Sequence, residues 1–368
     1  MANDAGVAAR FLTTTEIVAE ARKNLSDTAW DYVCGGAETE TTVLRNRYAL
    51  DAIAFRPRVL RSVDGTDVTR SAFGAKRRLP VLLGPLGGMT EFHEAGALSS
   101  AEAAREFGCL MMLSSVTEPD LEVVAESAGK QLIYQLYVHG DDRWVADRVG
   151  RAVDAGVQAF CVTVDVTYYG RRERSLLRRH SLPGRPFGTL RSGEEHAMRV
   201  DWAFIAKLKR KLKVPLIVKG IATAEDAALA LENGVDVVYV SNHGGRQLDH
   251  GRGAIDMLPE VMSTVRGKAE IIVDGGFMRG TDILKALAMG ADLVGLGRLQ
   301  ALALGAAGRE GVVRMLELLE TEITVGMKLL GAAKLDELDG NSLHPAVPVV
   351  RPDPFGAFPL LGSLAKRD

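Results

Sequence analysis

A histidine and an arginine stand close together directly after an apolar run. The run covers residues 235–239, and the stretch SNHGGRQLD at 241–249 follows it, with two glycines between His243 and Arg246. A neutral histidine can remove a proton as a general base, and an arginine can hold a carboxylate through paired N–H donors. A structural turn needs the glycines but not both of these side chains, so the stretch is a candidate active site.

Eight short apolar runs alternate with longer segments of helical periodicity from about residue 80 onward. We predict a strand for each run: 80–85 (PVLLGP), 110–115 (LMMLSS), 131–137 (QLIYQLY), 159–165 (AFCVTVD), 215–220 (PLIVKG), 235–242 (VDVVYVSN), 270–276 (EIIVDGG) and 293–298 (LVGLGR). Their near-continuous hydrophobicity is typical of strands that are buried on both faces of a parallel sheet. Eight such units between 80 and 325 predict an α/β fold with a (β/α)8 TIM barrel, which needs about 250 residues. A doubly wound sheet is the alternative.

The segments outside the barrel complete a single predicted domain covering all 368 residues. Residues 1–60 are expected to form an added N-terminal helical segment, with helices at 15–24 and 27–33. The proline-rich tail at 344–368 is expected to lie extended along the surface. The connection at 168–200, after the fourth strand, is long for a βα loop and is predicted to be a lid over the site. A solvated insertion is the alternative.

Composition and charge exclude several classes of protein. With 47% hydrophobic residues and a formal net charge of −2, the chain fits neither a disordered protein nor an electrostatic nucleic-acid binder. Its three cysteines are scattered, its histidines lack metal-ligand spacing, and no apolar run approaches the roughly 20 residues needed to cross a bilayer. The N-terminus shows no signal-peptide pattern. We therefore expect a cytoplasmic protein with no metal, membrane or nucleic-acid partner.

In a TIM barrel the active site lies at the carboxyl ends of the strands. In chain order, those ends carry polar side chains or glycine-rich turns: Pro85, Leu86 and Gly87; Ser114; Gln135 and Tyr137; Thr163 and Asp165; Lys219; Ser241, His243 and Arg246; Asp274, Gly275 and Gly276; Gly297 and Arg298. Any one of them could merely satisfy buried backbone groups or cap a helix. Eight ends that direct such groups at one mouth indicate a single ligand site.

Three of these ends suggest the ligand. Burying an unpaired ammonium is costly, so Lys219, inside an apolar strand, indicates an anionic or electron-rich partner. The glycines at 274–276 and 297 stand where TIM barrels commonly hold a phosphate, and Arg298 adds a bidentate charge. A phosphate together with an electron-accepting ring favours flavin mononucleotide (FMN) over a bare sugar phosphate.

The remaining ends supply chemistry beside that ring. Asp165 is the best-placed carboxylate to stabilise the imidazolium of His243. Arg172 and Arg246 could each hold a substrate carboxylate. The tyrosines that could add hydroxyl hydrogen bonds are Tyr32 and Tyr137. Such a site fits a 2-hydroxy acid whose carboxylate is held by the arginines, whose hydroxyl proton is taken by the histidine, and whose hydride is delivered to a cofactor.

The stretch at 241–249 resembles the signature of the FMN-dependent 2-hydroxy-acid oxidases and dehydrogenases, a family that includes glycolate oxidase, lactate oxidase, mandelate dehydrogenase and 4-hydroxymandelate oxidase. The resemblance covers about 28–335. Its other motifs are DYVCGGAE (31–38), FRPRVL (55–60), LSS (113–115), QLY (135–137), TVD (163–165), GRR (170–172), VKG (218–220), DGG (274–276) and GR (297–298). Together these motifs are far more specific than any one of them alone.

The resemblance implies a role for each matching residue. His243 would be the proton-abstracting base, paired with Asp165, and Lys219 would lie at the N1–O2 edge of the flavin. The implied substrate contacts are Arg172, Arg246, Tyr32, Tyr137 and Tyr169. The implied FMN contacts are Ser114, Gln135 and Thr163 at the ring, Asp274 at the ribityl chain, Arg298 at the phosphate, and also Pro85, Leu86, Gly87, Ser241, Gly275, Gly276, Met278 and Gly297.

Several features depart from the family pattern. Met278 stands where many relatives have an arginine on the phosphate side, so the phosphate would depend more on backbone amides and Arg298. Val116 stands where glycolate oxidase has a tryptophan, which should open part of the substrate pocket. Gly87 replaces a bulkier residue at the flavin-facing turn and would alter oxygen access. The connection at 168–200 is shorter than in many relatives, which suggests a more open lid.

These features predict the oxidation of an L-2-hydroxy acid, bulky or aromatic if Val116 opens the pocket, to the 2-oxo acid. Reduced FMN would be reoxidised by oxygen, giving hydrogen peroxide. A dehydrogenase that passes electrons to a quinone or another acceptor is the alternative. A flavin-dependent isomerase on the same barrel is less favoured, because it would not require two arginines around a His–Asp pair. The resemblance also implies a homotetramer.

Overall fold

The eight apolar runs form a closed barrel in the computed structural model, which describes residues 4–179, 197, 199–349 and 353–364. Its parallel strands are β4 (Val81–Leu83), β5 (Leu110–Ser114), β6 (Leu132–Leu136), β7 (Phe160–Thr163), β8 (Leu216–Ile221), β9 (Val237–Val240), β10 (Glu270–Val273) and β11 (Leu293–Leu296). Each strand pairs with the next in the chain, and β11 pairs with β4 to close the ring. The predicted (β/α)8 TIM barrel is confirmed.

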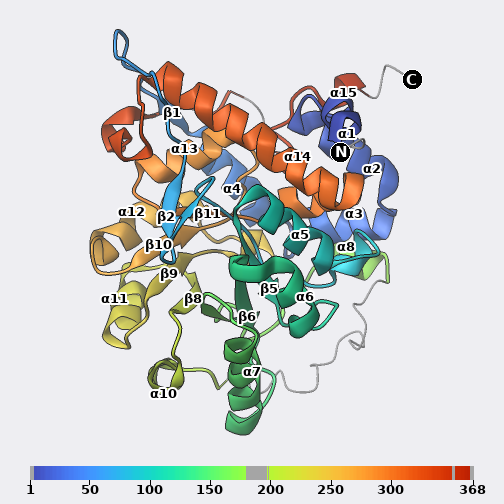
Figure 1. The fold of residues 1–368 in the computed structure, drawn as a ribbon, viewed down its shortest axis with the longest axis vertical. Helices are drawn as coiled ribbons and strands as arrows, with labels where there is room; N and C mark the ends of the chain where they lie inside the picture. The colour runs from blue at the N-terminus through green and yellow to red at the C-terminus, as the bar shows by residue number, and fades with distance from the viewer. Residues whose placement is uncertain (1–3, 180–196, 198, 350–352, 365–368) are drawn as a thin grey trace.

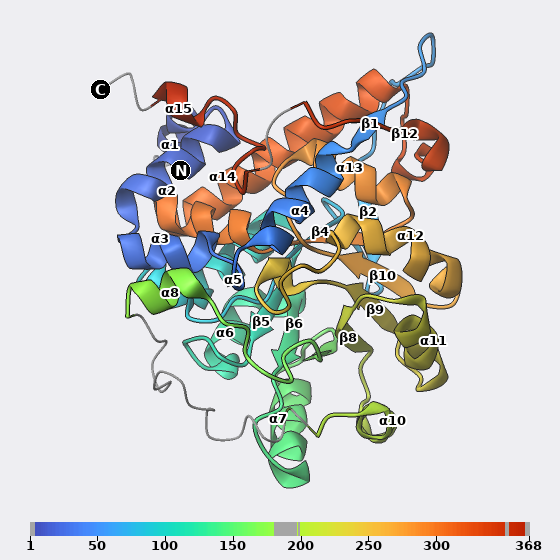
Figure 2. The same ribbon diagram turned by 180° about the vertical axis from the view of Figure 1, so that it is seen from behind.

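Helices follow the strands and form the outer layer of the barrel (Figures 1 and 2). They are α5 (Ala97–Phe107), α6 (Leu121–Ala128), α7 (Asp142–Asp154), α10 (Trp202–Lys211), α11 (Ala224–Glu232), α12 (Ala254–Val265), α13 (Gly280–Ala288) and the long α14 (Arg298–Leu330). Side-chain caps start several of them: Asp141 accepts backbone N–H groups at the start of α7, and Thr223 does so at the start of α11. Short 3-10 turns lie in the connections: η1 (Met89–Glu91), η2 (Gly129–Gln131), η3 (His243–Gly245), η4 (Leu335–Glu337) and η5 (Gly340–Ser342).

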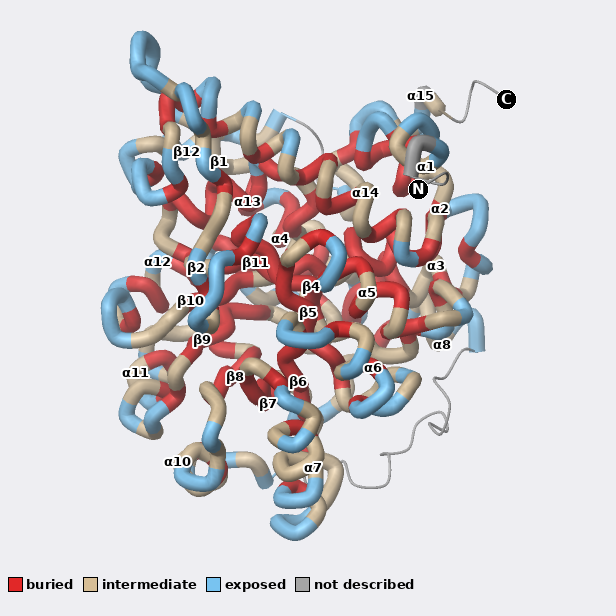
Figure 3. The backbone as a smooth tube through the Cα atoms, in the orientation of Figure 1, coloured by how far each residue is buried: buried red, intermediate tan, exposed pale blue. Residues whose placement is uncertain are grey.

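Alternating side chains of the strands build two cores. Residues such as Leu110 and Met112 belong to a cluster on the inner face of the barrel, whereas Met111 and Leu113, on the other face of the same strand, pack in the layer beneath the helices. All four are buried. Figure 3 shows this buried material concentrated at the strands, with exposure rising on the outer helices.

The N-terminal segment adds four helices: α1 (Asp4–Arg10), α2 (Thr14–Asn24), α3 (Asp27–Cys34) and α4 (Thr41–Asp51). The helices predicted at 15–24 and 27–33 are present as α2 and α3. Helix α2 packs along α14, and α4 packs against η3 and α12. Sequence analysis did not predict α4, which brings the N-terminal segment to the turn that carries His243.

The tail is held at two places rather than only lying along the surface. Strand β12 (Leu343–Pro345) pairs antiparallel with β1 (Ile53–Phe55). Further along, the ring of Phe355 stacks on Trp30 with centroids 5.1 Å apart, and Phe358 is buried. The last described element is α15 (Leu361–Leu364). A separate hairpin of β2 (Arg70–Ala72) and β3 (Ala75–Arg77) precedes the barrel.

The predicted lid is only partly within the described residues. Its first part contains α8 (Glu173–Leu177), whereas residues 180–196 and 198 lie outside them, so the lid stays a prediction. In the described part of the chain, no helix is both long and apolar enough to cross a membrane, and no group of three potential metal ligands occurs. The three cysteines are free and buried.

Candidate active site

The alternation of side chains along the strands explains why polar groups gather at one mouth. Residues two apart on a strand point to the same side. On β6 the inner cluster contains Ile133, and the next inward residue is Gln135. On β8 it contains Ile217, and the next inward residue is Lys219. The inner face therefore changes from apolar to polar at the carboxyl ends of the strands.

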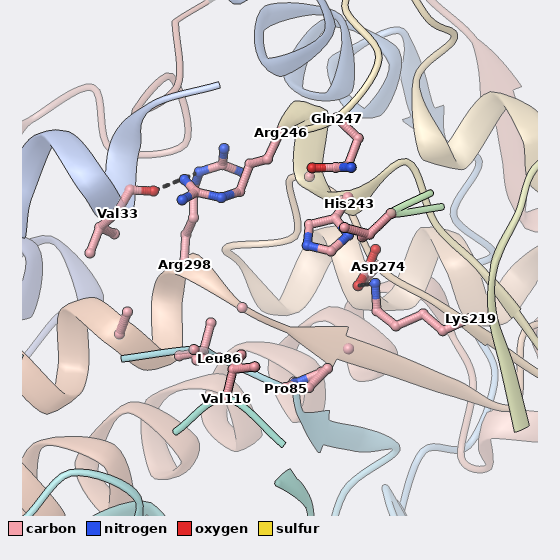
Figure 4. Close-up of a pocket in the computed structure, with 18 of the residues that line it drawn as sticks. Val33, Pro85, Leu86, Val116, Lys219, His243, Arg246, Gln247, Asp274 and Arg298 are labelled. Carbon is pink, nitrogen blue, oxygen red and sulfur yellow. Dashed lines mark hydrogen bonds and ion pairs between the residues drawn. The ribbon is translucent and has the colours of Figure 1, made fainter. Parts of the chain in front are cut away.

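One pocket opens at this mouth (Figure 4). The predicted site residues that line it are Tyr32, Pro85, Leu86, Gly87, Tyr137, Tyr169, Arg172, Lys219, His243, Arg246, Asp274, Gly275, Gly276, Met278, Gly297 and Arg298. The other predicted site residues lie at the same ends of the strands, behind the lining: Ser114, Gln135, Thr163, Asp165 and Ser241. The structure thus brings the whole predicted set to one place.

His243 is held on both sides of its ring. Nδ1 lies 3.0 Å from Asp165 Oδ1, and Nε2 lies 3.4 Å from the Tyr137 hydroxyl. Since a carboxylate only accepts hydrogen bonds, the neutral ring carries its proton on Nδ1 and leaves Nε2 able to accept one. The backbone of His243 is left-handed, with φ +56°, and its N–H donates to Ser241 Oγ at 2.9 Å. A basic nitrogen is thereby fixed at the pocket in a backbone conformation that is uncommon outside glycine.

Burial and charge act in opposite directions on this pair. Burial lowers the pKa of His243 below its ordinary value of 6.5, and Asp165 counteracts this only in part. Burial raises the pKa of Asp165, but His243, Lys219 and a backbone hydrogen bond together hold that pKa below its ordinary value. At neutral pH the pair is therefore a neutral imidazole against a carboxylate, which is the state that a general base requires.

Lys219 has the anionic partner that its burial requires. Its Nζ donates to Ser241 Oγ at 2.8 Å and lies 3.2 Å from Asp274 Oδ2, while Ser241 Oγ donates to Asp274 Oδ1 at 2.6 Å. Burial lowers the pKa of Lys219, but the nearby carboxylates, Asp274 first, raise it above its ordinary value. The lysine therefore stays charged beneath the pocket.

Two guanidinium groups lie against the carboxyl end of α3 (Figure 4). Arg246 Nη1 donates to the carbonyls of Tyr32 at 2.6 Å and Gly35 at 2.9 Å. Arg298 donates to the carbonyls of Val33 at 3.1 Å and Gly35 at 3.0 Å. Carbonyls at the end of a helix are otherwise unpaired and carry partial negative charge, so α3 holds both cations at the edge of the pocket.

A third guanidinium belongs to the same group. Arg172 is buried, stacks 4.1 Å above the ring of Tyr169, and donates through Nε to the Arg246 carbonyl at 3.4 Å. Among the described residues, Arg172, Arg246 and Arg298 form no ion pair with a carboxylate. Burial, followed by the neighbouring Arg172, lowers the pKa of Arg246 to about 10, so it stays charged at neutral pH. Cations that are buried or half-buried without counter-ions are costly, and the gathering of three such groups indicates an anion-binding site.

Buried polar atoms without partners show that the mouth fits the flavin ring. In the described structure, both amide atoms of Gln135 and the hydroxyl of Thr163 are buried and form no hydrogen bond. Such atoms are rare because each loses its water without replacement. At Gly87, which lines the pocket, an added Cβ would lie 3.1 Å from Val116 Cγ2 and 3.7 Å from the Tyr32 hydroxyl. Unpaired polar atoms at the ends of β6 and β7, together with a pocket wall that carries no side chain at Gly87, fit a flat, heteroatom-rich group.

The end of the pocket predicted to hold the phosphate contains glycines with left-handed backbone conformations. Gly275 and Gly276 have φ of +113° and +85°, conformations that a side chain rarely adopts. Met278 is buried and contributes no charge; its N–H donates to Asp282 Oδ2 at 3.0 Å. Asp282 is in turn paired with Arg47 at 2.8 Å. Met278 thus belongs to a loop braced by Asp282 and Arg47 and supplies no cation to the pocket.

Comparison with known proteins identifies the family. The family described as FMN-dependent dehydrogenase matches residues 21–345. The chain belongs to this family. L-lactate oxidase of Nostoc sp. is 37% identical over 348 residues, which cover 88% of this chain and 95% of that protein. Glycolate oxidase of Spinacia oleracea is 36% identical over 349 residues, covering 89% and 94%.

Solved structures agree with this family. Mandelate oxidase with benzoyl-formic acid superposes with a TM-score of 0.85 at 34% identity, covering 92% of this chain and all of that chain. A mandelate oxidase variant with (S)-mandelic acid gives the same values. The predicted family and its cofactor, FMN, are therefore confirmed.

Sequence analysis assigned no role to Asp249, the last residue of the SNHGGRQLD stretch. Its carboxylate accepts the backbone N–H of Thr42 at 2.8 Å and of Thr39 at 3.0 Å, where α4 begins. Burial raises the pKa of Asp249, but hydrogen bonds, first from the Thr39 hydroxyl and then from the Thr42 backbone N–H, hold it well below its ordinary value. Nearby, Asn46 of α4 exchanges amide hydrogen bonds with Asn242 at 3.1 and 2.7 Å. These partners lie about 200 positions apart in the chain, so no local pattern could have revealed them.

The start of the predicted lid is tied to the N-terminal segment by ion pairs. Arg174 of α8 forms two hydrogen bonds with Glu40, at 2.6 and 2.7 Å. Arg178, just after α8, donates to Asp31 at 2.7 Å. The segment that follows Arg172 is thereby fastened beside α3, next to the cluster of guanidinium groups.

Proposed function

We propose that this FMN-dependent 2-hydroxy-acid oxidase converts an L-2-hydroxy acid with a bulky or aromatic side chain to the 2-oxo acid, with oxygen as acceptor and hydrogen peroxide as product. The observation that carries the proposal is the His243–Asp165 pair beside guanidinium groups that have no carboxylate partner among the described residues. A 2-hydroxy acid bears a carboxylate and a hydroxyl on adjacent carbons. One region of the site would bind the first and the other would deprotonate the second.

The residues present fit FMN. Gln135 and Thr163 would supply their unpaired polar atoms to the ring, and Lys219 would place its positive charge at the ring edge that gains electron density. The groups that would surround the rest of the cofactor are Pro85, Leu86, Gly87, Ser114, Ser241, Asp274, Gly275, Gly276, Met278, Gly297 and Arg298. When bound, FMN supplies the two-electron oxidant.

Arg172 and Arg246 would hold the substrate carboxylate. A planar guanidinium matches a carboxylate with two parallel N–H donors. Tyr32 lies beneath Arg246, whose guanidinium is 4.8 Å from the ring, and its hydroxyl donates to the Gly87 carbonyl at 3.2 Å. These contacts would orient the acid so that its hydroxyl faces His243.

His243 would then take the hydroxyl proton at Nε2. The imidazolium that forms is stabilised by Asp165 at Nδ1, as in other His–carboxylate pairs. Loss of the proton from oxygen and of the C2 hydrogen with its electron pair leaves a carbonyl at C2, so one proton and one hydride equivalent account for the oxidation. The Tyr137 hydroxyl, 3.4 Å from Nε2, would contact the same oxygen.

The substrate side chain would extend toward Val116. Val116 and Phe92 line the pocket, and Phe92 stacks beside Tyr32 with centroids 5.9 Å apart. Tyr169 lines the pocket as well. This apolar, aromatic wall supports a bulky or aryl group rather than a hydrogen atom at C2.

The decisive experiment is anaerobic. Purified protein is expected to be yellow, and a panel containing glycolate, lactate and mandelate should bleach the flavin, with the larger acid acting fastest. Reoxidation by oxygen compared with a quinone then separates oxidase from dehydrogenase. If no 2-hydroxy acid reduces the bound FMN, the proposed function is wrong.

We also propose that the chain is a single domain that acts as a cytoplasmic homotetramer. The homotetramer rests on the resemblance to the family alone, and the compartment rests on the composition and the scattered cysteines. Light scattering coupled to size-exclusion chromatography should give four times the chain mass of 39.5 kDa. A mass equal to one chain would contradict it.

A further inference from the structure

Gln247, at the edge of the pocket beside His243 in Figure 4, joins two active-site loops through its side-chain amide. Its Nε2 donates to the carbonyl of Asp165 at 3.0 Å and to that of Tyr168 at 2.9 Å. Its Oε1 accepts the backbone N–H of Gly170 at 3.2 Å. One side chain from the turn after β9 therefore binds three backbone groups of the loop after β7.

These three partners determine which way the side-chain amide of Gln247 faces and occupy its donors. A backbone carbonyl only accepts and a backbone N–H only donates, so Nε2 must face Asp165 and Tyr168, and Oε1 must face Gly170. Both amide hydrogens therefore form hydrogen bonds within the protein. Gln247 consequently has no donor left for a substrate, although its side chain reaches the pocket.

The two loops are in direct backbone contact where the amide joins them. A Cβ at Gly170 would lie 2.4 Å from the carbonyl oxygen of Arg246 and 2.7 Å from that of Gln247. Such distances leave no room for a side chain, so residue 170 must be glycine if the loops are to meet. The Arg172 Nε–Arg246 carbonyl contact, 3.4 Å, lies in the same seam.

The site contains two functional pairs, the base with its carboxylate and the two arginines proposed to hold the substrate, and each loop carries one member of each pair. The loop after β7 carries Asp165 and Arg172, and the turn after β9 carries His243 and Arg246. The distance between the loops therefore sets both the contact of the base with its carboxylate and the separation of the two guanidinium groups. A change of about 1 Å in such a distance can cost roughly a hundredfold in rate.

We propose that Gln247 is a positioning residue that sets the spacing between these two loops, and through it the geometry of the base and of the carboxylate site. The inference rests on the proposed function, since it assigns Gln247 to the same reaction. It explains why a glutamine follows Arg246 directly: only a side-chain amide of this length offers two donors and an acceptor to one loop.

Gln247→Met in the FMN-loaded full chain tests the proposal, because methionine keeps the length and removes the hydrogen bonds. We expect kcat/KM to fall roughly a hundredfold, with KM raised and kcat per bound FMN lowered, and with the FMN content unchanged. A variant that merely folded less well would bind less FMN in total, but its kcat per bound FMN and its KM would stay at the wild-type values. Amide hydrogen exchange over 165–172 should become faster, which is measurable without any turnover.

Two further variants make the test specific. Gly170→Ala forces the same loops apart from the other side and should raise KM and lower kcat per FMN in the same pattern, even if Gln247→Met fails to fold. Gln131→Met is the matched control, because Gln131 accepts from Arg77 at the amino end of β6, away from the mouth. It should keep wild-type KM and kcat.

The outcomes separate this proposal from the proposed function. Wild-type KM and kcat per FMN in Gln247→Met, despite faster exchange over 165–172, would overturn the positioning role. Unchanged exchange would overturn the contact itself. If the wild-type enzyme oxidises no hydroxy acid, the proposed function fails, while the exchange measurement still reports whether Gln247 holds the loop.

Discussion

The pocket has a base region around His243 and an arginine region around Arg246, and the two differ in whether their charged side chains have partners of opposite charge. In the base region, His243 faces Asp165, and Lys219 is paired with Asp274, so every buried charge has a partner. In the arginine region, the guanidinium groups contact backbone carbonyls, the Tyr169 hydroxyl and the rings of Tyr32 and Tyr169, and no carboxylate of the described residues pairs with them. A paired charge is fixed before any ligand arrives, which suits chemistry that needs fixed geometry. An unpaired one gains its partner from the ligand, which suits binding.

The largest expected effect is in the base region. His243→Gln removes the proton acceptor and should lower the rate of anaerobic flavin reduction by roughly a hundred- to ten-thousandfold. Stopped-flow absorbance of the bound flavin measures it. FMN should be retained, since the lysine and the glycine turns are untouched. His250→Gln, an exposed position on the same loop, is the control and should reduce at the wild-type rate. A near-normal rate in His243→Gln would place the base elsewhere.

In the arginine region the expected losses are smaller and fall on binding. Arg246→Lys keeps the charge but loses the paired donors, so kcat/KM should drop by about ten- to a hundredfold, as expected for about 1.5–3 kcal/mol per charged hydrogen bond. Arg172→Lys should behave alike. Steady-state kinetics with the preferred acid measures both.

Arg298→Lys sharpens the same comparison, because Arg298 is assigned to the cofactor phosphate. It should weaken FMN binding in a fluorescence titration of the apoprotein while leaving KM for the acid nearly unchanged. If Arg298→Lys raises KM as much as Arg246→Lys does, the three guanidinium groups serve one ligand and the division proposed here is wrong.

The pH dependence tests whether the base is neutral in the free enzyme. The base must be unprotonated, and burial lowers the pKa of His243 below 6.5. Activity should therefore be lost only as pH falls through that lowered pKa, with kcat/KM decreasing tenfold per unit on the acid side. A pH profile of kcat/KM checks this. An acid limb centred above 6.5 would show that Asp165 outweighs burial.

The smallest effect should be one of selectivity. Val116→Trp fills the pocket wall and should shift the ratio of kcat/KM for mandelate over glycolate by about tenfold toward the smaller acid, the scale of steric discrimination in apolar pockets. Val123→Trp, at an exposed position on α6, is the control. An unchanged ratio in Val116→Trp would mean that the side chain of the substrate lies elsewhere.

Features that depend on neighbouring residues in the chain could be predicted from the sequence, whereas contacts between residues far apart in the chain could not. The barrel was predictable because the strands are apolar on both faces, and the mouth was predictable because inward positions such as Gln135 and Lys219 follow apolar ones at a spacing of two. The capping of α4 by Asp249 and the bracing of the loops by Gln247 were not predictable, because neither residue type nor spacing records a partner far along the chain. The carbonyl partners of Arg298 were hidden for the same reason.

The contacts of α3 with the guanidinium groups have a consequence for folding. Arg246 meets the carbonyls of Tyr32 and Gly35 across 214 and 211 positions, and Arg298 meets those of Val33 and Gly35 across 265 and 263. Contacts between residues so far apart in the chain form late in folding, because closing a large loop costs conformational entropy. Helices would therefore form before the pocket does. During refolding in the presence of FMN, quenching of flavin fluorescence should lag behind far-ultraviolet circular dichroism, because the flavin binds only chains in which these distant segments have already met.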